Sequence, residues 1–189
     1  MAITDIPMRF DSVPLLWKIE SIVPDVLCDS LVSEIESSNP SPVATSSAFR
    51  DQDKIIRDDP TLAIKLFSLI EPHLPRTIGA LTLVGLNERL RLYRYRPGQS
   101  FSPHMDHWYQ ATPTTLSLLT VLVYLNADFE GGQTQFMEQI DAVVVPSKGS
   151  VAVFQHKVRH EGREVTRGKK YALRTDAMYK ADGPVVLTF

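Results

Sequence analysis

The chain has 189 residues, a net charge of −2 and 43% hydrophobic residues, so it can bury the core of one domain. This charge excludes a global basic field for nucleic acid or anionic membranes. One cysteine, Cys28, excludes an intrachain disulfide, and we expect it to be a small buried residue. The first ten residues lack the features of a secretory signal, and the apolar run at 118–125 is too short to span a bilayer. We therefore expect a soluble cytoplasmic protein.

Residues 15–75 are predicted to be mainly helical. One helix begins at Pro24, because proline is tolerated in the first turn. A second has Asp59 as its cap and Pro60 at its first position. The segment 37–47 is rich in Ser, Pro and Asn, and it is predicted to be a loop. The apolar stripes of both helices indicate scaffold rather than function.

From about Leu83 the apolar residues alternate with a period of two, which predicts β structure. Many short strands separated by turns suggest a sandwich or barrel, with the helices on one outer face. We predict one domain, 1–189, with helical support at about 15–80 and a β core at about 83–189. The strongest strand predictions are 90–95, 116–125, 143–145, 151–154, 171–179 and 185–189.

Three residues predict a metal site in the β region. His104 and Asp106 are two apart, so on a strand they share a face, and His160 follows from a distant segment. Two imidazoles and one carboxylate bind Fe(II) on one side and leave other positions open. The absence of thiolates argues against structural zinc.

Other histidines are weaker candidates for that site. His107 follows Asp106 and would point to the opposite face, at the rim of the site. His156 lies four residues before His160, but the neighbouring apolar residues favour a strand over a helix, so we expect a structural or surface histidine. His73, between two prolines, is expected to be solvated.

The segments that hold the three ligands resemble a known family. The run from Tyr95 to Asp106, YRPGQSFSPHMD, is similar to the Y-x-x-G-x-x-F/Y-x-x-H-x-D motif of prolyl 4-hydroxylase-like Fe(II)/2-oxoglutarate dioxygenases. Tyr124-Leu-Asn and the following FEGGQTQF resemble that family's Y-L-N…GG-x-T-x-F segment. The run HEGREVTRGKKY from His160 resembles its H-x-G-x-x-V-x-x-G-x-K-[WY] segment. The resemblance covers roughly residues 90–179.

The resemblance implies a double-stranded β-helix, a distorted, cupin-like jelly roll. It also implies Fe(II), 2-oxoglutarate and O2 as cofactor and cosubstrates, with ascorbate as an optional addition. His104, Asp106 and His160 would be the iron ligands and catalytic residues. Lys170 would pair with the 5-carboxylate of 2-oxoglutarate, with Tyr95 and Tyr124 as hydrogen-bond donors, because a buried dianion needs such partners.

Two positions near Lys170 carry alternatives. Lys169 is a rival cation, but alternation puts Lys170 on the same face as Arg174, which favours Lys170. Arg174 itself falls where related enzymes often place a small hydroxyl residue. It is expected to be either a second cosubstrate clamp or the structural partner of Asp176.

Arginines and aromatic residues are the candidates for substrate contact. Arg91 shares a face with Tyr95, so it should point toward the cavity and bind a substrate carboxylate or a nearby acid. Arg94 and Arg96 are expected to be solvated. Thr134 should line the cavity, whereas Trp108 and Tyr109 either contact substrate or pack on strand ends.

The predicted activity is hydroxylation of an unactivated C–H bond with release of succinate and CO2. A prolyl or peptidyl substrate and a small amino-acid-like molecule are both open, because fold and metal chemistry do not choose between them. The expected partner is therefore a peptide, protein or small-molecule substrate, with no nucleic acid and no membrane, and the chain a monomer or homodimer. The alternative is a non-catalytic, cupin-like protein that binds metal or ligand without turning over 2-oxoglutarate.

Overall fold

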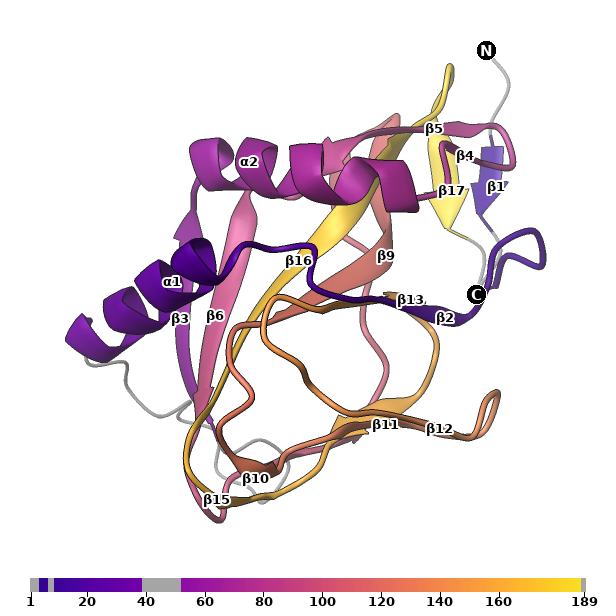
Figure 1. Cartoon of the computed structure of the whole chain (residues 1–189). Helices are drawn as coiled ribbons and strands as arrows, with labels where there is room; N and C mark the ends of the chain where they lie inside the picture. The colour runs from indigo at the N-terminus through magenta and orange to yellow at the C-terminus, as the bar shows by residue number, and fades with distance from the viewer. Residues whose placement is uncertain (1–3, 7–8, 39–51, 188–189) are drawn as a thin grey trace.

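The computed structural model describes residues 4–6, 9–38 and 52–187, and these residues form two β-sheets with helices on one side (Figure 1). The architecture confirms the predicted jelly-roll fold. The major sheet contains β2 (Leu16–Ile19), β3 (Asp53–Asp58), β4 (Thr77–Ile78), β5 (Leu81–Leu86), β6 (Arg89–Tyr95), β8 (Gln110–Thr112), β9 (Thr115–Tyr124), β13 (Val151–Gln155) and β16 (Lys170–Lys180). The minor sheet contains β7 (Phe101–His104), β11 (Thr134–Phe136), β12 (Ala142–Val144) and β14 (His160–Gly162).

Two short ladders complete the sheet structure. β10 (Glu130–Gly131) pairs with β15 (Val165–Arg167), and β1 (Thr4–Ile6) pairs in parallel with β17 (Val185–Leu187). The predicted strands at 90–95, 116–125, 143–145, 151–154 and 171–179 are present within one or two residues. The last one, 185–189, is present as β17, and its final two residues lie outside the described part.

The helices begin where the sequence predicts. α1 (Asp25–Ser37) follows Pro24, and α2 (Pro60–Ile70) is capped by Asp59, whose side chain accepts a hydrogen bond of 2.9 Å from the Leu62 backbone N–H. A short 3₁₀ turn, η1 (Glu71–His73), follows α2. None of the helices in the described ranges is long and apolar enough to cross a membrane.

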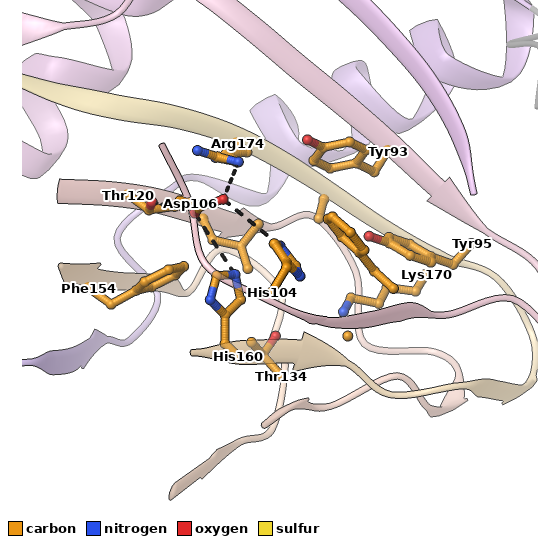
Figure 2. A pocket seen from close by; sticks show the side chains of 14 residues that line it. Tyr93, Tyr95, His104, Asp106, Thr120, Thr134, Phe154, His160, Lys170 and Arg174 are labelled. Atoms are coloured by element: carbon orange, nitrogen blue, oxygen red, sulfur yellow. Dashed lines mark hydrogen bonds and ion pairs between the residues drawn. The ribbon is translucent and has the colours of Figure 1, made fainter. Parts of the chain in front are cut away.

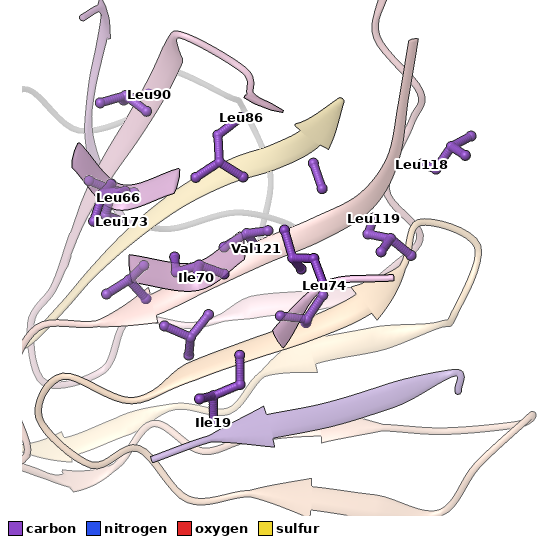
Figure 3. Packing of buried hydrophobic residues seen from close by; sticks show 14 of the residues in the cluster. Ile19, Leu66, Ile70, Leu74, Leu86, Leu90, Leu118, Leu119, Val121 and Leu173 are labelled. Atoms are coloured by element: carbon purple, nitrogen blue, oxygen red, sulfur yellow. The ribbon is translucent and has the colours of Figure 1, made fainter. Parts of the chain in front are cut away.

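The helices cover the outer face of the major sheet, where the main hydrophobic core lies (Figure 3). Leu66 and Ile70 of α2 are fully buried against sheet residues such as Val121 and Leu173. Leu31 and Ile35 bury the inner face of α1, and Cys28 beside them is also buried, as predicted.

The register around β16 determines which side chains face the inside of the roll. β16 lies between β6 and β9, with Lys170 opposite Tyr95, Ala172 opposite Tyr93 and Tyr124, and Arg174 opposite Arg91 and Leu122. Because side chains alternate along a strand, these residues share the face toward the minor sheet. The intervening Tyr171 and Leu173 join the core under the helices.

The prediction that residues 15–75 are mainly helical is wrong in part. β2 and β3 lie in this range and belong to the major sheet, β2 on β13 and β3 on β6. The sequence of β3, DKIIRD, shows little alternation, and its extended shape comes from pairing with β6 rather than from its own pattern. Most of the predicted loop at 37–47 lies outside the described residues.

The prediction that Arg94 is solvated is also wrong. β3 covers one side of β6, so Arg94 is only 4% exposed. Its guanidinium bonds Asp53 at 2.7 Å and Glu36 of α1 at 3.0 Å. A buried arginine needs such acidic partners, and they come from segments that are distant in sequence. Arg96 remains half-exposed and also pairs with Asp53, at 2.8 Å.

Candidate functional site

A cavity lies between the two sheets, and side chains from both of them line it (Figure 2). We call it the inner cavity. The major sheet contributes Tyr93, Tyr95, Thr120, Leu122, Phe154, Lys170, Ala172 and Arg174, and the opposite side contributes Phe101, His104, Asp106, Thr134, His160 and Gly162.

The three predicted metal ligands meet in this cavity. His104 and His160 are cross-strand partners on β7 and β14, and Asp106 lies just beyond the end of β7. The Nε2 atoms of the two histidines are each 3.9 Å from a carboxylate oxygen of Asp106. One ligand atom from each residue lies within 4.8 Å of the others, so the cluster can surround a single ion.

Both histidines are oriented by backbone carbonyls. His104 Nδ1–H donates to Ser102 O at 2.8 Å, and His160 Nδ1–H donates to Val158 O at 2.9 Å. With the proton on Nδ1, the lone pair of each Nε2 points toward Asp106, which is the arrangement that a metal requires. The His104 ring also stacks on Phe101, with the ring centroids 3.5 Å apart.

The protonation states suit a cation. Burial, with the charge of His160, lowers the pKa of His104 to about 4, and burial also lowers the pKa of His160. Burial opposes the charge of Asp106, but Arg174 and the nearby histidines hold the pKa of its carboxyl well below its usual range. At neutral pH the cluster therefore offers two neutral nitrogens and one anionic oxygen, the donor set of a non-haem iron site.

Asp106 is held in place by a hydrogen-bond chain that the sequence reasoning missed. Thr120 Oγ1 donates to Asp106 Oδ2 at 2.6 Å, and it accepts from Nδ1–H of His156 at 2.8 Å. Nε2 of His156 accepts from Ser117 Oγ at 2.9 Å, which in turn accepts from the backbone N–H of Tyr109. Every member has a partner, so the chain fixes the direction of each donor.

These hydrogen bonds also define the role of His156. It is 1% exposed, so it is a structural histidine and not a surface one, and burial lowers its pKa to about 4. A signal was present in the sequence: Ser117 and Thr120 are the polar residues that interrupt the apolar run of β9. A hydroxyl inside a buried strand must find a partner.

The other end of the inner cavity holds a buried cation. Lys170 is 3% exposed, its Nζ donates to Gly132 O at 2.7 Å, and burial lowers its pKa to about 7. No acidic side chain of the described residues lies within ion-pair distance of it. Gly132 has φ +66°, and a Cβ there would lie 3.2 Å from Lys170 Cδ, so glycine allows the close approach. Lys169, in contrast, is exposed and pairs with Glu36.

Aromatic and hydroxyl groups surround Lys170. Its Nζ lies 5.2 Å from the ring centroid of Tyr95 and 5.6 Å from that of Tyr124. Tyr95 and Thr134 line the inner cavity, as predicted for Thr134, whereas Tyr124 does not. The Tyr124 hydroxyl is instead 2.7 Å from Thr134 Oγ1, so Tyr124 lies behind Thr134.

Arg174 and Arg91 share one buried acid. Arg174 Nη2 and Arg91 Nη1 are each 3.2 Å from an oxygen of Asp176, which is 1% exposed on its side chain. Arg174 also contacts Asp106, Nη1 to Oδ1, at 2.5 Å (Figure 2). The predicted pairing of Arg174 with Asp176 is thus present. Arg174 and Lys170 are four residues apart on β16, roughly 13 Å along the strand, and the partners of Arg174 are Asp106 and Asp176. Its predicted role as a cosubstrate clamp stays a prediction.

The remaining predicted residues lie outside the inner cavity. His107 and His73 are exposed. Trp108 is partly buried against the main core, with Nζ of Lys157 4.4 Å from the centroid of its ring, and Tyr109 is 43% exposed. Of these two aromatic residues, Trp108 therefore packs on the core and Tyr109 is exposed.

Comparison with known proteins shows what this arrangement resembles. A model of the 2OG-Fe(II) oxygenase superfamily matches residues 90–175, whereas no curated protein sequence matches the chain. Similar solved structures include the viral collagen prolyl hydroxylase of Paramecium Bursaria Chlorella virus-1 in complex with 2OG, with 20% identity, a TM-score of 0.62 and coverage of 90% of this chain and 98% of that one. A Pseudomonas putida prolyl-4-hydroxylase has 16% identity and a TM-score of 0.66, with coverage of 91% and 95%.

A third similar structure is a Trichoplax adhaerens prolyl hydroxylase in complex with a hypoxia inducible factor peptide fragment. It has 17% identity and a TM-score of 0.68, and the match covers 88% of this chain and 84% of that one. At these identities the structural matches establish the shared fold.

Replacement of Thr120 by valine tests the hydrogen-bond chain. The variant leaves Asp106 Oδ2 and His156 Nδ1 without a partner, so metal affinity should fall about 10–100-fold. Competition for Fe(II) with a chelating dye under argon measures this affinity. Thr175→Val is the matched control, because it removes a buried hydroxyl, bonded to Asn87 O, from the opposite face of the major sheet. Equal metal affinity in both variants would contradict the role of Thr120.

The buried histidines predict how the metal-free protein responds to acid. His104 and His156 have folded pKa values of about 4 against an ordinary 6.5, so between these pH values the unfolded chain binds more protons. The free energy of unfolding should therefore fall from pH 6.5 to pH 4, by up to about 1.4 kcal/mol per pH unit for each histidine. Urea unfolding at several pH values, with chelator present, measures the slope.

His156→Gln should reduce that slope, and His73→Gln, which removes an exposed histidine, is the control. An identical slope in the wild type and in His156→Gln would show that burial of His156 does not govern acid stability.

Proposed function

We propose that this protein, whose residues 90–175 match a model of the 2OG-Fe(II) oxygenase superfamily, is a 2-oxoglutarate-dependent non-haem iron dioxygenase that hydroxylates a prolyl, peptidyl or small amino-acid-like substrate. In this proposal His104, Asp106 and His160 hold Fe(II), and Lys170 binds the 5-carboxylate of 2-oxoglutarate. The observation that carries it is the presence, in one cavity, of a metal-binding cluster and a buried lysine without an acidic partner.

The residues present fit both groups. Two neutral imidazoles and a carboxylate match Fe(II), and their donor atoms already point toward one another. An ammonium group as buried as that of Lys170 is costly unless an anion compensates it, and the far carboxylate of a dicarboxylate is such an anion. Burial depresses the pKa of Lys170, and a bound carboxylate would raise it.

The cosubstrate end of the inner cavity can be assigned residue by residue. Lys170 supplies the charge, and Tyr95 of the major sheet and Thr134 of the minor sheet line the cavity from opposite sides. Tyr124 acts on the carboxylate through Thr134, because their hydroxyls are 2.7 Å apart. We assign Thr134 to the cosubstrate rather than to the substrate, and Arg174 to Asp106 rather than to the cosubstrate.

When bound, iron, 2-oxoglutarate and O2 supply the oxidising chemistry that converts a C–H bond to an alcohol and releases succinate and CO2. The protein orients these groups and excludes water. Phe101 and Phe154 pack against the rings of His104 and His160, with centroid distances of 3.5 and 4.5 Å. Arg174 and Thr120 each hold one oxygen of Asp106, so the carboxylate keeps its orientation.

Conversion of 2-oxoglutarate to succinate by the full-length chain tests this function. With Fe(II) and O2 the wild type should form succinate, and Lys170→Met should weaken 2-oxoglutarate binding at least about tenfold, because a charge-assisted hydrogen bond is lost. Lys169→Met is the matched control, since that lysine is exposed and pairs with Glu36. The proposal fails if the wild type forms no succinate, or if both variants bind 2-oxoglutarate equally well.

The pH dependence of cosubstrate binding gives an independent check. Lys170 has a pKa of about 7 before binding, and a bound carboxylate would raise it. Affinity for 2-oxoglutarate should therefore fall as pH rises above 7, by up to about tenfold per pH unit, and binding at pH 8 should take up a proton. Calorimetry of the metal-loaded protein in buffers of different ionisation enthalpy measures both effects. A pH-independent affinity, equal to that of Lys170→Met, would contradict the assignment.

A further inference from the structure

A second hollow adjoins the inner cavity, and we call it the outer cleft. It has a volume of about 540 Å³ and shares Phe101, His104, Asp106 and Arg174 with the inner cavity. Its other walls are the segment 105–109, Lys157, Lys54 and Arg91. Two of the three proposed iron ligands thus border it, so a molecule in the outer cleft lies directly beside the metal site.

The lining of the outer cleft is strongly cationic. Lys54, Arg91, Arg174 and Lys157 come from β3, β6, β16 and the turn after β13. The one acid that lines it within the described chain is Asp106, which the proposed function commits to iron. Cations that converge from four separate segments on a concave site raise the local concentration of anions.

The two arginines carry more charge than their acid neutralises. Arg91 and Arg174 are direct neighbours across β6 and β16, an arrangement that is unfavourable for like charges unless an acid lies between them. Asp176 provides that acid, with 3.2 Å to each guanidinium. Once Asp106 is shared with Fe(II), two guanidiniums depend on one buried carboxylate, which leaves an excess positive charge beside the metal.

Arg91 is the member of this pair that is open to a ligand. Its side chain is 21% exposed, and in the contacts between described residues only Nη1 is used, toward Asp176. A guanidinium has five N–H donors, so most of those on Arg91 remain available at the cleft wall. Its neighbour Arg174 is 13% exposed on its side chain and is occupied by Asp106 and Asp176.

We propose that the outer cleft is the substrate site and that the substrate carries a carboxylate, which Arg91 binds. The inference rests on the proposed function and adds that the substrate, whether peptide or small molecule, is an anion. Arg91 and Arg174 are paired on adjacent strands, which are about 4.8 Å apart. Arg174 contacts Asp106, one of the proposed iron ligands. A substrate carboxylate bound to Arg91 would therefore lie only a few bonds from the carbon that is hydroxylated. Trp108 and the exposed Tyr109 offer apolar contacts for the rest of the molecule.

Paramagnetic broadening of ligand proton signals by the full-length protein, loaded with Mn(II) and 2-oxoglutarate, tests the inference without turnover. The probes are matched pairs: L-proline and L-prolinamide, L-leucine and L-leucinamide, and a proline pentapeptide with aspartate or asparagine beside the proline. At least one acid should bind about tenfold more tightly than its amide, which is the loss expected for one charge-assisted hydrogen bond. Binding of a free amino acid points to a small-molecule substrate, and binding of the aspartate peptide alone points to a peptide.

Variants test whether Arg91 is the residue that makes acids bind more tightly than amides. Arg91→Gln should abolish the preference for the acid, Arg91→Lys should restore part of it, and Arg89→Gln should retain it, since Arg89 is on the same strand but outside the outer cleft. Equal broadening by acids and amides, or no broadening by any acid, would overturn the inference from the wild type alone. Calorimetric titration with 2-oxoglutarate separates the two proposals. If 2-oxoglutarate does not bind, the proposed function fails. If 2-oxoglutarate binds but the protein does not prefer acids over amides, only this inference fails.

Discussion

The two-residue alternation of β16 is the constraint on which the rest of the structure depends. This strand lies in the middle of the major sheet, and its side chains point in turn to two different environments. Lys170, Arg174 and Asp176 face the minor sheet, where they form the polar half of the site. Tyr171 and Leu173 face the helices, where they belong to the main core. A shift of one residue in register would exchange charge and core, so the burial that stabilises the fold also positions the chemistry.

Charge compensation explains how so many ionised groups stay inside a small roll. Asp106 is balanced by Arg174, Asp176 by two arginines, and Asp53 by Arg94 and Arg96. Lys170 has no such balance within the described chain, and it lies at the end of the cavity away from Arg174. A buried charge without a partner is costly, so an anion bound beside Lys170 would stabilise the folded protein.

The structure brings the predicted site residues together more closely than it follows the predicted scaffold. His104, Asp106 and His160 share one cavity with Lys170; the ligand pattern singled out the first three, and the family resemblance indicated the role of Lys170. In contrast, β2 and β3 were missed, since their extended shape comes from pairing with distant strands. The prediction that Arg94 is solvated was wrong for a similar reason, because its burial depends on β3 and on Glu36 of α1. Thr120 and Ser117 could have been noticed as polar residues in an apolar strand. That His156 is their partner could not be predicted, because it depends on how β13, which ends just before His156, pairs with β9.

The most direct test of the central claim is an anaerobic visible difference spectrum of the full-length protein, first with Fe(II) and then with 2-oxoglutarate. If His104, Asp106 and His160 hold iron beside a cosubstrate anchored by Lys170, a weak charge-transfer band should appear only when both are present. The band should be absent in Asp106→Ala, which lacks the anionic ligand. No band at saturating 2-oxoglutarate, with iron shown to be bound, would contradict the account.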